Sequence, residues 1–353
     1  MRHTAIKFFS FMLPALICAT ILVDKIDAQK TSAPAKSGYH LLKKIQVGGE
    51  GGWDYLFVDG AARRLYVSRG TRVMVFDADT GKSVGEIPDT PGVHGITIAP
   101  DFDRGFTSNG RDGSVTIFDS KTLKPISKVK VGLNPDCIMY DPATERVFAF
   151  NRASSSFSAI NAKTGEVAAP VDLGGHPEFA VADGKGMVFV NLDNKSEIVA
   201  IDSKKLEVKA HWPVEPGEDP SGLAIDRKHM RLFSVCGNQK MVVMDATTGK
   251  VVATLPIGTG PDAAGFDPET NLAFSSNGEG TLTVIHQDSQ DKYSVAEAVT
   301  TQRGARTMAL DPKTHNVFLA TAEFGAPPAP TPERPHPRGA MVPNSFVILV
   351  FGK

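Results

Sequence analysis

Carboxylate, amide, imidazole and guanidinium side chains recur at equivalent points along this chain, where they could hold a hard cation or a polar organic ligand. One set stands where successive inner strands are expected to begin, and it comprises Asp54, His94, Asp136, Glu178, Ser221, Asp262 and Arg306. A second set stands at the expected ends of the next strands, and it comprises Asn109, Asn151 and Asn277. Trp53 and His176 lie in adjoining loops. If the strands surround one axis, these side chains converge on one mouth and form a ligand site.

The internal repetition of the chain separates structural candidates from functional ones. Pro-Asp occurs at 135–136 and 261–262, and Asn-Gly occurs at 109–110 and 277–278, so these residues favour a structural role in satisfying loop amides. The residues that break the repeat are better candidates for binding or catalysis, and they are Trp53, His94, His176, Glu178 and Arg306. The alternative is that a lone histidine or arginine there is only solvated, or paired with a neighbouring carboxylate.

The elements that would position these residues repeat at nearly constant intervals. Six short apolar runs lead into a turn, and their last residues are Asp77, Asp119, Asn161, Asp202, Asp245 and His286. The intervals between these residues are 42, 42, 41, 43 and 41 positions. A period of this length built from strand-like segments is typical of a β-propeller blade.

Each period can hold four antiparallel strands, and the seven expected inner-strand starts predict seven blades. Only three strands of the last blade lie at the C-terminal end of the sequence. Residues 39–47 resemble the outer strands of other blades, which predicts that this N-terminal segment completes the last blade and closes the ring. The expected fold class is therefore all-β, a seven-bladed propeller formed by residues 39–353 as one domain.

A proline-rich insertion interrupts the last blade between its second and third strands. It covers residues 323–344 and contains seven prolines, which prevent regular helix or sheet. Two interpretations stay open. The insertion is either a tolerated surface loop or a lid or docking arm, since long loops in compact domains are often functional.

The N-terminus has the features of an export signal. A basic start precedes an apolar run over residues 8–23, and a small residue follows at Ala28. The run is short for a bilayer-spanning helix, so we expect cleavage of residues 1–28 and no transmembrane span in the mature chain. Residues 29–38 are expected to form a flexible lead-in. These features predict a periplasmic or secreted protein.

Composition and motifs exclude several classes of function. The net charge of −1 and the absence of long basic runs give no support to nucleic-acid binding. Serine-hydrolase elbows, phosphate-binding glycine loops, haem-attachment motifs and zinc-protease motifs do not occur in the sequence. Cys137 and Cys236 are too few and too widely spaced for a disulfide framework or a zinc motif, and two separate thiols are favoured over a bridge.

The repeats resemble those of the YncE-like, or YVTN-repeat, β-propellers. The resemblance lies in the Asp-Pro steps at 141–147 and 311–317 and in the Asp-x-x-Thr-Gly-Lys turns at 77–82 and 245–250. It lies also in the Gly-x-x-Pro-Asp entries to inner strands, and it covers residues 39–353. The resemblance implies architecture and export, because the family has no common reaction or catalytic motif.

Two functions of different classes follow. The first is a binding or interaction propeller whose partner is another protein, a cell-envelope polymer or a small polar ligand held at the channel mouth. The second is an enzyme resembling the propeller lactonases, which hold a divalent metal at the mouth of the channel. That resemblance implies Ca²⁺ or another divalent cation held by Asp54, Asp136, Glu178, Asp262, Asn109, Asn151 and Asn277. It implies His94 or His176 as general base. No cofactor is identified by a motif, and the binding function is preferred.

Overall fold

The computed structural model describes residues 1–5, 36–329, 331 and 339–353. The chain divides into two units, Met1–Ala33 and Pro34–Lys353. In the first unit the described residues 1–5 have no regular secondary structure, and the predicted signal and lead-in lie largely outside the described residues. At the described end of the lead-in, the Ser37 hydroxyl donates a hydrogen bond to Glu297 at 2.7 Å.

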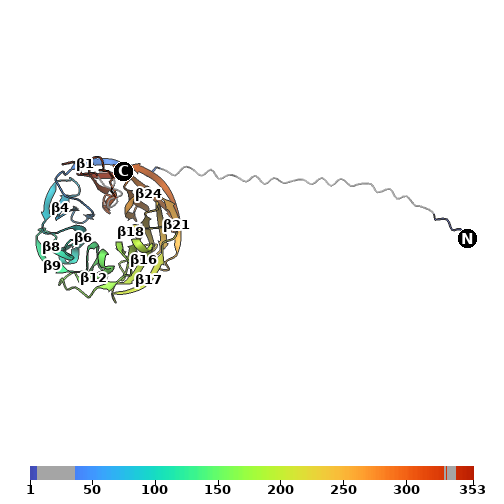
Figure 1. Cartoon of the computed structure of the whole chain (residues 1–353), viewed down its shortest axis with the longest axis horizontal. Helices are drawn as coiled ribbons and strands as arrows, with labels where there is room; N and C mark the ends of the chain where they lie inside the picture. Colours follow the sequence, from blue (N-terminus) through green and yellow to red (C-terminus); the bar gives the residue numbers. More distant parts are fainter. Residues whose placement is uncertain (6–35, 330, 332–338) are drawn as a thin grey trace. The chain divides into compact units, whose positions relative to one another are not determined.

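The second unit is a ring of seven four-stranded antiparallel sheets, as the repeat predicts (Figure 1). Blade 1 contains β2 (Leu56–Asp59), β3 (Arg64–Arg69), β4 (Arg72–Asp77) and β5 (Ser83–Ile87). Blade 2 contains β6 (Val93–Ala99), β7 (Arg104–Asn109), β8 (Ser114–Asp119) and β9 (Pro125–Lys130). Blade 3 contains β10 (Pro135–Asp141), β11 (Arg146–Asn151), β12 (Ser156–Asn161) and β13 (Val171–Asp172).

The remaining blades follow the same order. Blade 4 contains β14 (Pro177–Ala182), β15 (Met187–Leu192), β16 (Glu197–Asp202) and β17 (Glu207–Pro213). Blade 5 contains β18 (Pro220–Asp226), β19 (Arg231–Cys236), β20 (Lys240–Asp245) and β21 (Val251–Pro256). Blade 6 contains β22 (Pro261–Asp267), β23 (Leu272–Asn277), β24 (Thr281–Ser289) and β25 (Lys292–Thr300). Blade 7 contains β26 (Thr307–Leu310), β27 (Val317–Thr321), β28 (Val347–Gly352) and the N-terminal strand β1 (His40–Gln46).

The predicted closure by the N-terminal strand is confirmed. β1 pairs antiparallel with β28 from His40 opposite Gly352 to Gln46 opposite Val347, and Figure 1 shows β1 beside the C-terminus. An ion pair between Arg63 of blade 1 and Asp311 of blade 7, at 2.8 Å, also crosses the seam. Closure covers the edge of β28, which would otherwise be open, with the strand β1.

Local sequence explains the turns between the third and fourth strands of the blades. At the end of β20, the Asp245 carboxylate accepts hydrogen bonds from the backbone amides of Thr247 and Thr248, both at 2.9 Å. Gly249 follows with φ of 72°, which glycine adopts without steric cost. The repeating residues of this motif therefore build the turn and are not free for chemistry.

The hydrophobic core lies between the faces of neighbouring blades. Leu65 and Val67 of blade 1, for example, pack with Phe318 and Ile348 of blade 7 in one buried cluster. Because each blade buries both faces against its neighbours, the strands are apolar on alternate and often on consecutive positions. The rigid ring fixes the positions of the loops at the ends of the inner strands.

The described part of the chain has three 3₁₀ helices in its loops, η1 (Pro100–Phe102), η2 (Arg152–Ser154) and η3 (Asp193–Lys195). The last two follow β11 and β15 and bring charged side chains to one end of the channel. Among the described residues, no helix is sufficiently long and apolar to cross a membrane.

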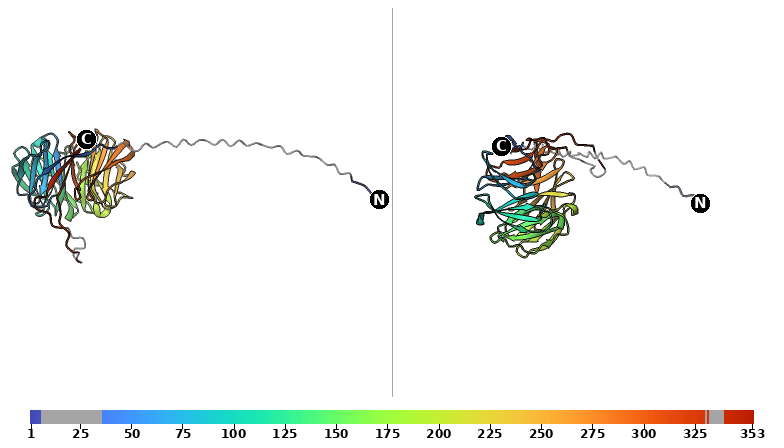
Figure 2. Two further views of the ribbon diagram at one scale, coloured as in Figure 1. Left: turned by 90° about the horizontal axis from the view of Figure 1, so that it is seen from above. Right: turned by 60° about the vertical axis from the view of Figure 1, so that its left-hand side comes forward.

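The proline-rich insertion joins β27 to β28, and Figure 2 shows its described ends leaving one face of the ring. These ends pair as a short ribbon, with an isolated bridge between Phe324 and Met341. The Gly325 amide donates to the carbonyl of Ala340, and the Val342 amide donates to that of Glu323, both at 2.8 Å. Residues 330 and 332–338 lie outside the described part.

Candidate functional site

An acidic cavity of about 310 Å³ lies where the inner strands of several blades begin. We call it the acidic cup. Its charged lining consists of six carboxylates and one guanidinium, from Asp54, Asp136, Glu178, Asp193, Asp219, Asp262 and Arg306. The residues come from six of the seven blades or the loops before them, so the cup lies on the axis of the ring.

Two stacked aromatic rings close the floor of the cup. Tyr55, just before β2 of blade 1, stacks on Phe179 in β14 of blade 4, with ring centroids 4.6 Å apart. Blades 1 and 4 are not neighbours in the ring, so this contact spans the central channel. Burial raises the pKa of the Tyr55 hydroxyl well above its usual value of 10, so the floor stays uncharged. The two rings therefore cover the floor of the cavity, which stays open at the mouth of the channel.

His94 connects two carboxylates of the cup. Its Nδ1 lies 2.6 Å from Asp54 Oδ2 and 3.8 Å from Asp136 Oδ1. Burial alone would lower the pKa of His94, but the hydrogen bond to Asp54 and the charges of Asp136 and Asp54 outweigh burial and raise it. Burial also raises the pKa of Asp136 to about 6, despite the opposing charge of His94.

Arg152 holds the opposite side of the cup. Its guanidinium lies 3.2 Å from Glu178 Oε1 and 2.5 Å from Asp193 Oδ2. Burial is the main cause that raises the pKa of Glu178 to about 8, and the charge of Asp136 adds to it. The charge of Arg152 opposes both effects without overcoming them. At neutral pH the Glu178 carboxyl is therefore largely protonated.

The third side of the cup is built around Asp262. The Ser221 hydroxyl donates to the backbone carbonyl of Asp262 at 2.9 Å. Arg306 Nη1 lies 3.7 Å from Asp262 Oδ1, a loose ion pair for a side chain that is 43% exposed. Asp262 and Ser221 thus define a polar wall, and Arg306 reaches over its rim.

The structure brings together most of the predicted ligand-binding residues and separates two of them. Asp54, Asp136, Glu178, Ser221, Asp262 and Arg306 line the cup, and His94 stands behind Asp54. His176 is on the rim, 46% exposed, with Nδ1 3.6 Å from Asp193 Oδ1. Trp53 lines a different pocket and packs against Phe346 in a tilted contact, with ring centroids 4.9 Å apart.

The three predicted asparagines are committed to their own blades. All are fully buried, and each Nδ2 donates to two hydroxyl groups on the adjacent strand. The carbonyl oxygens of Asn109 and Asn277 accept from Thr107 and Ser275, and that of Asn151 accepts from the Gly132 amide. This is the structural role that the recurrence of Asn-Gly favours, so these amides do not add ligands to the cup.

One group of residues has the donors that a divalent cation uses. Single ligand atoms of Asp54, His94 and Asp136 lie within 4.8 Å of one another. Carboxylate oxygen and imidazole nitrogen suit several divalent metals, whereas Ca²⁺ prefers oxygen alone and more ligands than this group supplies. The metal-dependent hydrolase stays a prediction from sequence.

Several residues of the cup were not among the predicted site residues. Arg152 and Asp193 directly follow the predicted ends of β11 and β15, so their position after the second strand was a usable signal. Tyr55 and Phe179 each follow a predicted inner-strand residue by one position. Nothing in the repeat indicates that these two rings meet across the channel.

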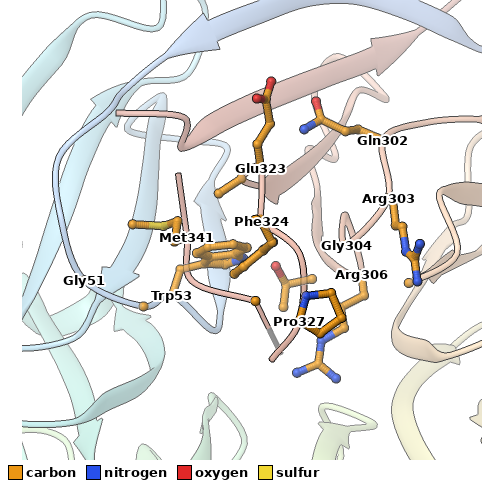
Figure 3. A pocket seen from close by; sticks show the side chains of 16 residues that line it. Gly51, Trp53, Gln302, Arg303, Gly304, Arg306, Glu323, Phe324, Pro327 and Met341 are labelled. Carbon is orange, nitrogen blue, oxygen red and sulfur yellow. The ribbon is translucent and has the colours of Figure 1, made fainter. Parts of the chain in front are cut away.

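A larger pocket of about 1260 Å³ adjoins the cup beneath the insertion. We call it the insertion pocket. Figure 3 shows Trp53, Phe324 and Met341 gathered in one part of it, and Arg303 and Arg306 elsewhere on its lining. Arg306 lines both cavities.

Comparison with known proteins identifies the fold and no family. No protein-family model matches the sequence, and no curated protein matches it. The crystal structure of RRP9 WD40 repeats superposes with a TM-score of 0.72 at 8% identity, covering 91% of this chain and 99% of that chain. The structure of U3-55K superposes with a TM-score of 0.70 at 8% identity, covering 90% of this chain and 99% of that chain. Identity this low shows a shared propeller fold alone.

Proposed function

We propose that the chain is an exported, YncE-like propeller that acts as a binding module and holds the cationic group of a polar ligand or partner in the acidic cup. One observation carries the proposal. Six carboxylates face one small cavity with a closed aromatic floor, while the basic groups Arg152, Arg306 and His94 offset only part of their charge.

The electrostatics of the cup favour a cation over an anion. The pKa values of Asp136 and Glu178 are raised to about 6 and about 8, because burial disfavours their charged forms. A cation in the cup stabilises those charged forms and lowers both pKa values. Binding therefore releases protons, and affinity rises with pH through about 8, the value for Glu178.

The architecture suits recognition more than chemistry. The cup residues stand on inner strands and short loops of a closed ring, which holds them in fixed positions. A propeller fold is consistent with a protein-interaction module, and a cationic side chain or terminus of a partner would meet the cup. Export rests on the signal-like residues 1–28, and the YncE-like assignment rests on the repeat motifs.

The test is a matched pair of small probes, 1,4-diaminobutane and the uncharged 1,4-butanediol. Calorimetry and thermal melting at pH 6.5 and pH 8.5 are expected to show binding of the diamine alone, tighter at the higher pH. Combined Glu178→Gln and Asp262→Asn substitution should weaken it about tenfold or more. Asp103→Asn, at an exposed carboxylate remote from the cup lining, is the matched control.

Two results would overturn the proposal. If the diamine and the diol bind with equal affinity, the cup does not select for a cation. A rise in melting temperature with Ca²⁺ and none with the diamine would replace it by the metal-dependent hydrolase.

A further inference from the structure

The insertion pocket differs from the cup in size, charge and chemistry. Its volume of about 1260 Å³ is larger than the ~300–1,000 Å³ typical of small-molecule sites, so it can take an organic ligand with a sizeable body. Its walls come from the loop at Gly51–Trp53, the segment at 302–307 and the ribbon of the insertion.

One part of the pocket is apolar and firmly supported. Trp53, Phe324 and Met341 line it, and Phe324 is 45% exposed, which leaves its ring available for contact with a ligand. Trp53 packs against the buried ring of Phe346 in a tilted contact. The Arg69 guanidinium lies 4.0 Å from the centroid of the Phe346 ring. Aromatic and cation–π contacts of this kind hold the Trp53 ring in place.

Arg69 also fixes the loop that carries Trp53. It is buried, and its guanidinium donates to the carbonyls of Gly48, Glu50 and Gly51. Burial is the main cause that lowers the pKa of Arg69 to about 10, and the group stays protonated at neutral pH. The apolar wall is therefore built on a fixed support.

The cationic part of the lining carries two guanidinium groups with spare donors. Arg303 is exposed, and no ion pair or side-chain hydrogen bond of it is found within the described part of the chain. Among the described residues, the one ion-pair partner of the Arg306 side chain is Asp262, at a loose 3.7 Å. Glu323 is the one carboxylate among the described residues of the lining, and Figure 3 draws it on the far side of Phe324 from Arg306.

A buried hydroxyl gives an independent indication of a ligand. Thr307 lines the pocket and is 4% exposed, yet its hydroxyl has no hydrogen-bond partner among the described residues. Buried polar groups in native proteins are almost always paired, so this hydroxyl is available to a polar atom of a ligand in the pocket. The arginines nearby imply that this atom belongs to an anion.

We propose that the insertion pocket binds an organic anion with an apolar body, such as an aromatic or acyl carboxylate. Arg303 and Arg306 hold the anionic group by charge-assisted hydrogen bonds, and Thr307 donates a further one. The apolar body packs against Trp53, Phe324 and Met341. This ligand is opposite in charge to that of the acidic cup, so the inference does not depend on the proposed function.

The experiment uses the fluorescence of Trp53. The chain has two tryptophans, Trp53 and Trp212, so Trp212→Phe leaves Trp53 as the only emitter. The probes are the anion 8-anilinonaphthalene-1-sulfonate and its uncharged analogue N-phenyl-1-naphthylamine. Both should quench Trp53 on binding, the anion at lower concentration.

Variants then separate the two parts of the pocket. Combined Arg303→Gln and Arg306→Gln should weaken binding of the anionic probe about tenfold and leave binding of the neutral probe unchanged. Phe324→Ala should weaken both probes, since it removes apolar contact area. Combined Arg72→Gln and Arg111→Gln, at arginines outside the pocket lining, is the matched control for loss of charge.

The results of this test can be told apart from the results of the test proposed for the acidic cup. Glu178→Gln, which belongs to the cup, should leave the anionic probe unaffected while changing the pH dependence of diamine binding. The inference is overturned if the anionic probe does not quench Trp53, or if the double arginine variant binds it as tightly as the parent. Circular dichroism melts of every variant establish that each is folded before binding is compared.

Discussion

Two sets of acidic side chains in this ring have pKa values that are shifted in opposite directions. At the outer turns, carboxylates such as Asp77 and Asp202 accept hydrogen bonds from backbone amides two or three residues further on, and their pKa values are lowered. For Asp77 the main cause is the Thr80 hydroxyl, and for Asp202 it is the Lys205 amide. At the channel mouth, burial raises the pKa values of Asp136 and Glu178.

The difference lies in the source of hydrogen-bond donors. A turn aspartate finds its donors in its own turn, so its charge is satisfied wherever the motif recurs. Within the described residues, no backbone amide donates to the carboxylates of Asp136 or Glu178. The repeat thus supplies stability, and the positions that depart from it supply charge that a ligand can neutralise.

The largest expected effect comes from opening the ring, because the mouth exists only while the blades are closed. Removing the segment 36–47 deletes the partner of β28, together with the buried Tyr39 and its hydrogen bond to the His315 carbonyl at 2.7 Å. Several backbone hydrogen bonds at about 0.5–1.5 kcal/mol each give an expected loss of about 3–6 kcal/mol. Urea denaturation measures it. Deleting only residues 1–33, the first unit of the chain, is the control, and equal stability of the two truncated chains would contradict the closure.

A second prediction compares one acid of each kind by pH. The pKa of Glu178 in the folded chain, about 8, is above its ordinary 4.5, so the stability linked to this group is complete below pH 4.5 and is lost as pH rises through about 8. Glu178→Gln should match the parent near pH 4.5. At pH 8.5 the variant should be more stable by roughly 4–5 kcal/mol, because a difference of one in pKa is worth about 1.4 kcal/mol.

Asp226 is the turn residue for comparison, because it is buried but has its own hydrogen-bond donors. It accepts from the Lys228 amide at 3.0 Å, His229 Nδ1 at 2.6 Å and Gln287 at 3.1 Å. Burial would raise its pKa, but the bonds from His229 and Gln287 outweigh burial and lower it. Asp226→Asn should therefore cost about 2 kcal/mol at neutral pH, an effect complete above the usual pKa of an aspartate and lost as pH falls through the lowered pKa of Asp226. Urea denaturation at several pH values measures the stability of both variants. An equal pH dependence of stability for the two variants would contradict the comparison.

Local pattern explains how much of this fold could be predicted from sequence. The turns at Asp77 and Asp245 and the strand periodicity are local, so the number of blades and the closing strand followed from the chain alone. The mouth residues Asp54, Asp136 and Asp262 were also placed together, because equivalent positions of a ring meet at its axis. Export and the role of the insertion stay predictions.

Contacts between blades were beyond the reach of the repeat. Arg152 and Asp193 are 41 residues apart in sequence and meet only because blades 3 and 4 are adjacent. The stack of Tyr55 on Phe179 depends on the width of the channel, which no local pattern encodes. The raised pKa of Glu178 follows from that burial, so the electrostatics of the mouth required three-dimensional packing.

The smallest expected effect concerns the balance inside the cup. His94 lies between Asp54 and Asp136, and its charge opposes the burial that raises the pKa of Asp136 to about 6. His94→Gln removes this charge and keeps a hydrogen-bond donor, so the pKa of Asp136 should rise further while stability changes by less than about 1 kcal/mol. Carboxyl ¹³C NMR titration of the parent and the variant measures the shift. His176→Gln is the control, because it makes the same substitution at an exposed histidine near Asp193 and adds no charge. It should leave the pKa of Asp136 unchanged. An unchanged Asp136 pKa in the His94 variant would show that the imidazole is neutral there, which would remove His94 from the charge balance of the mouth.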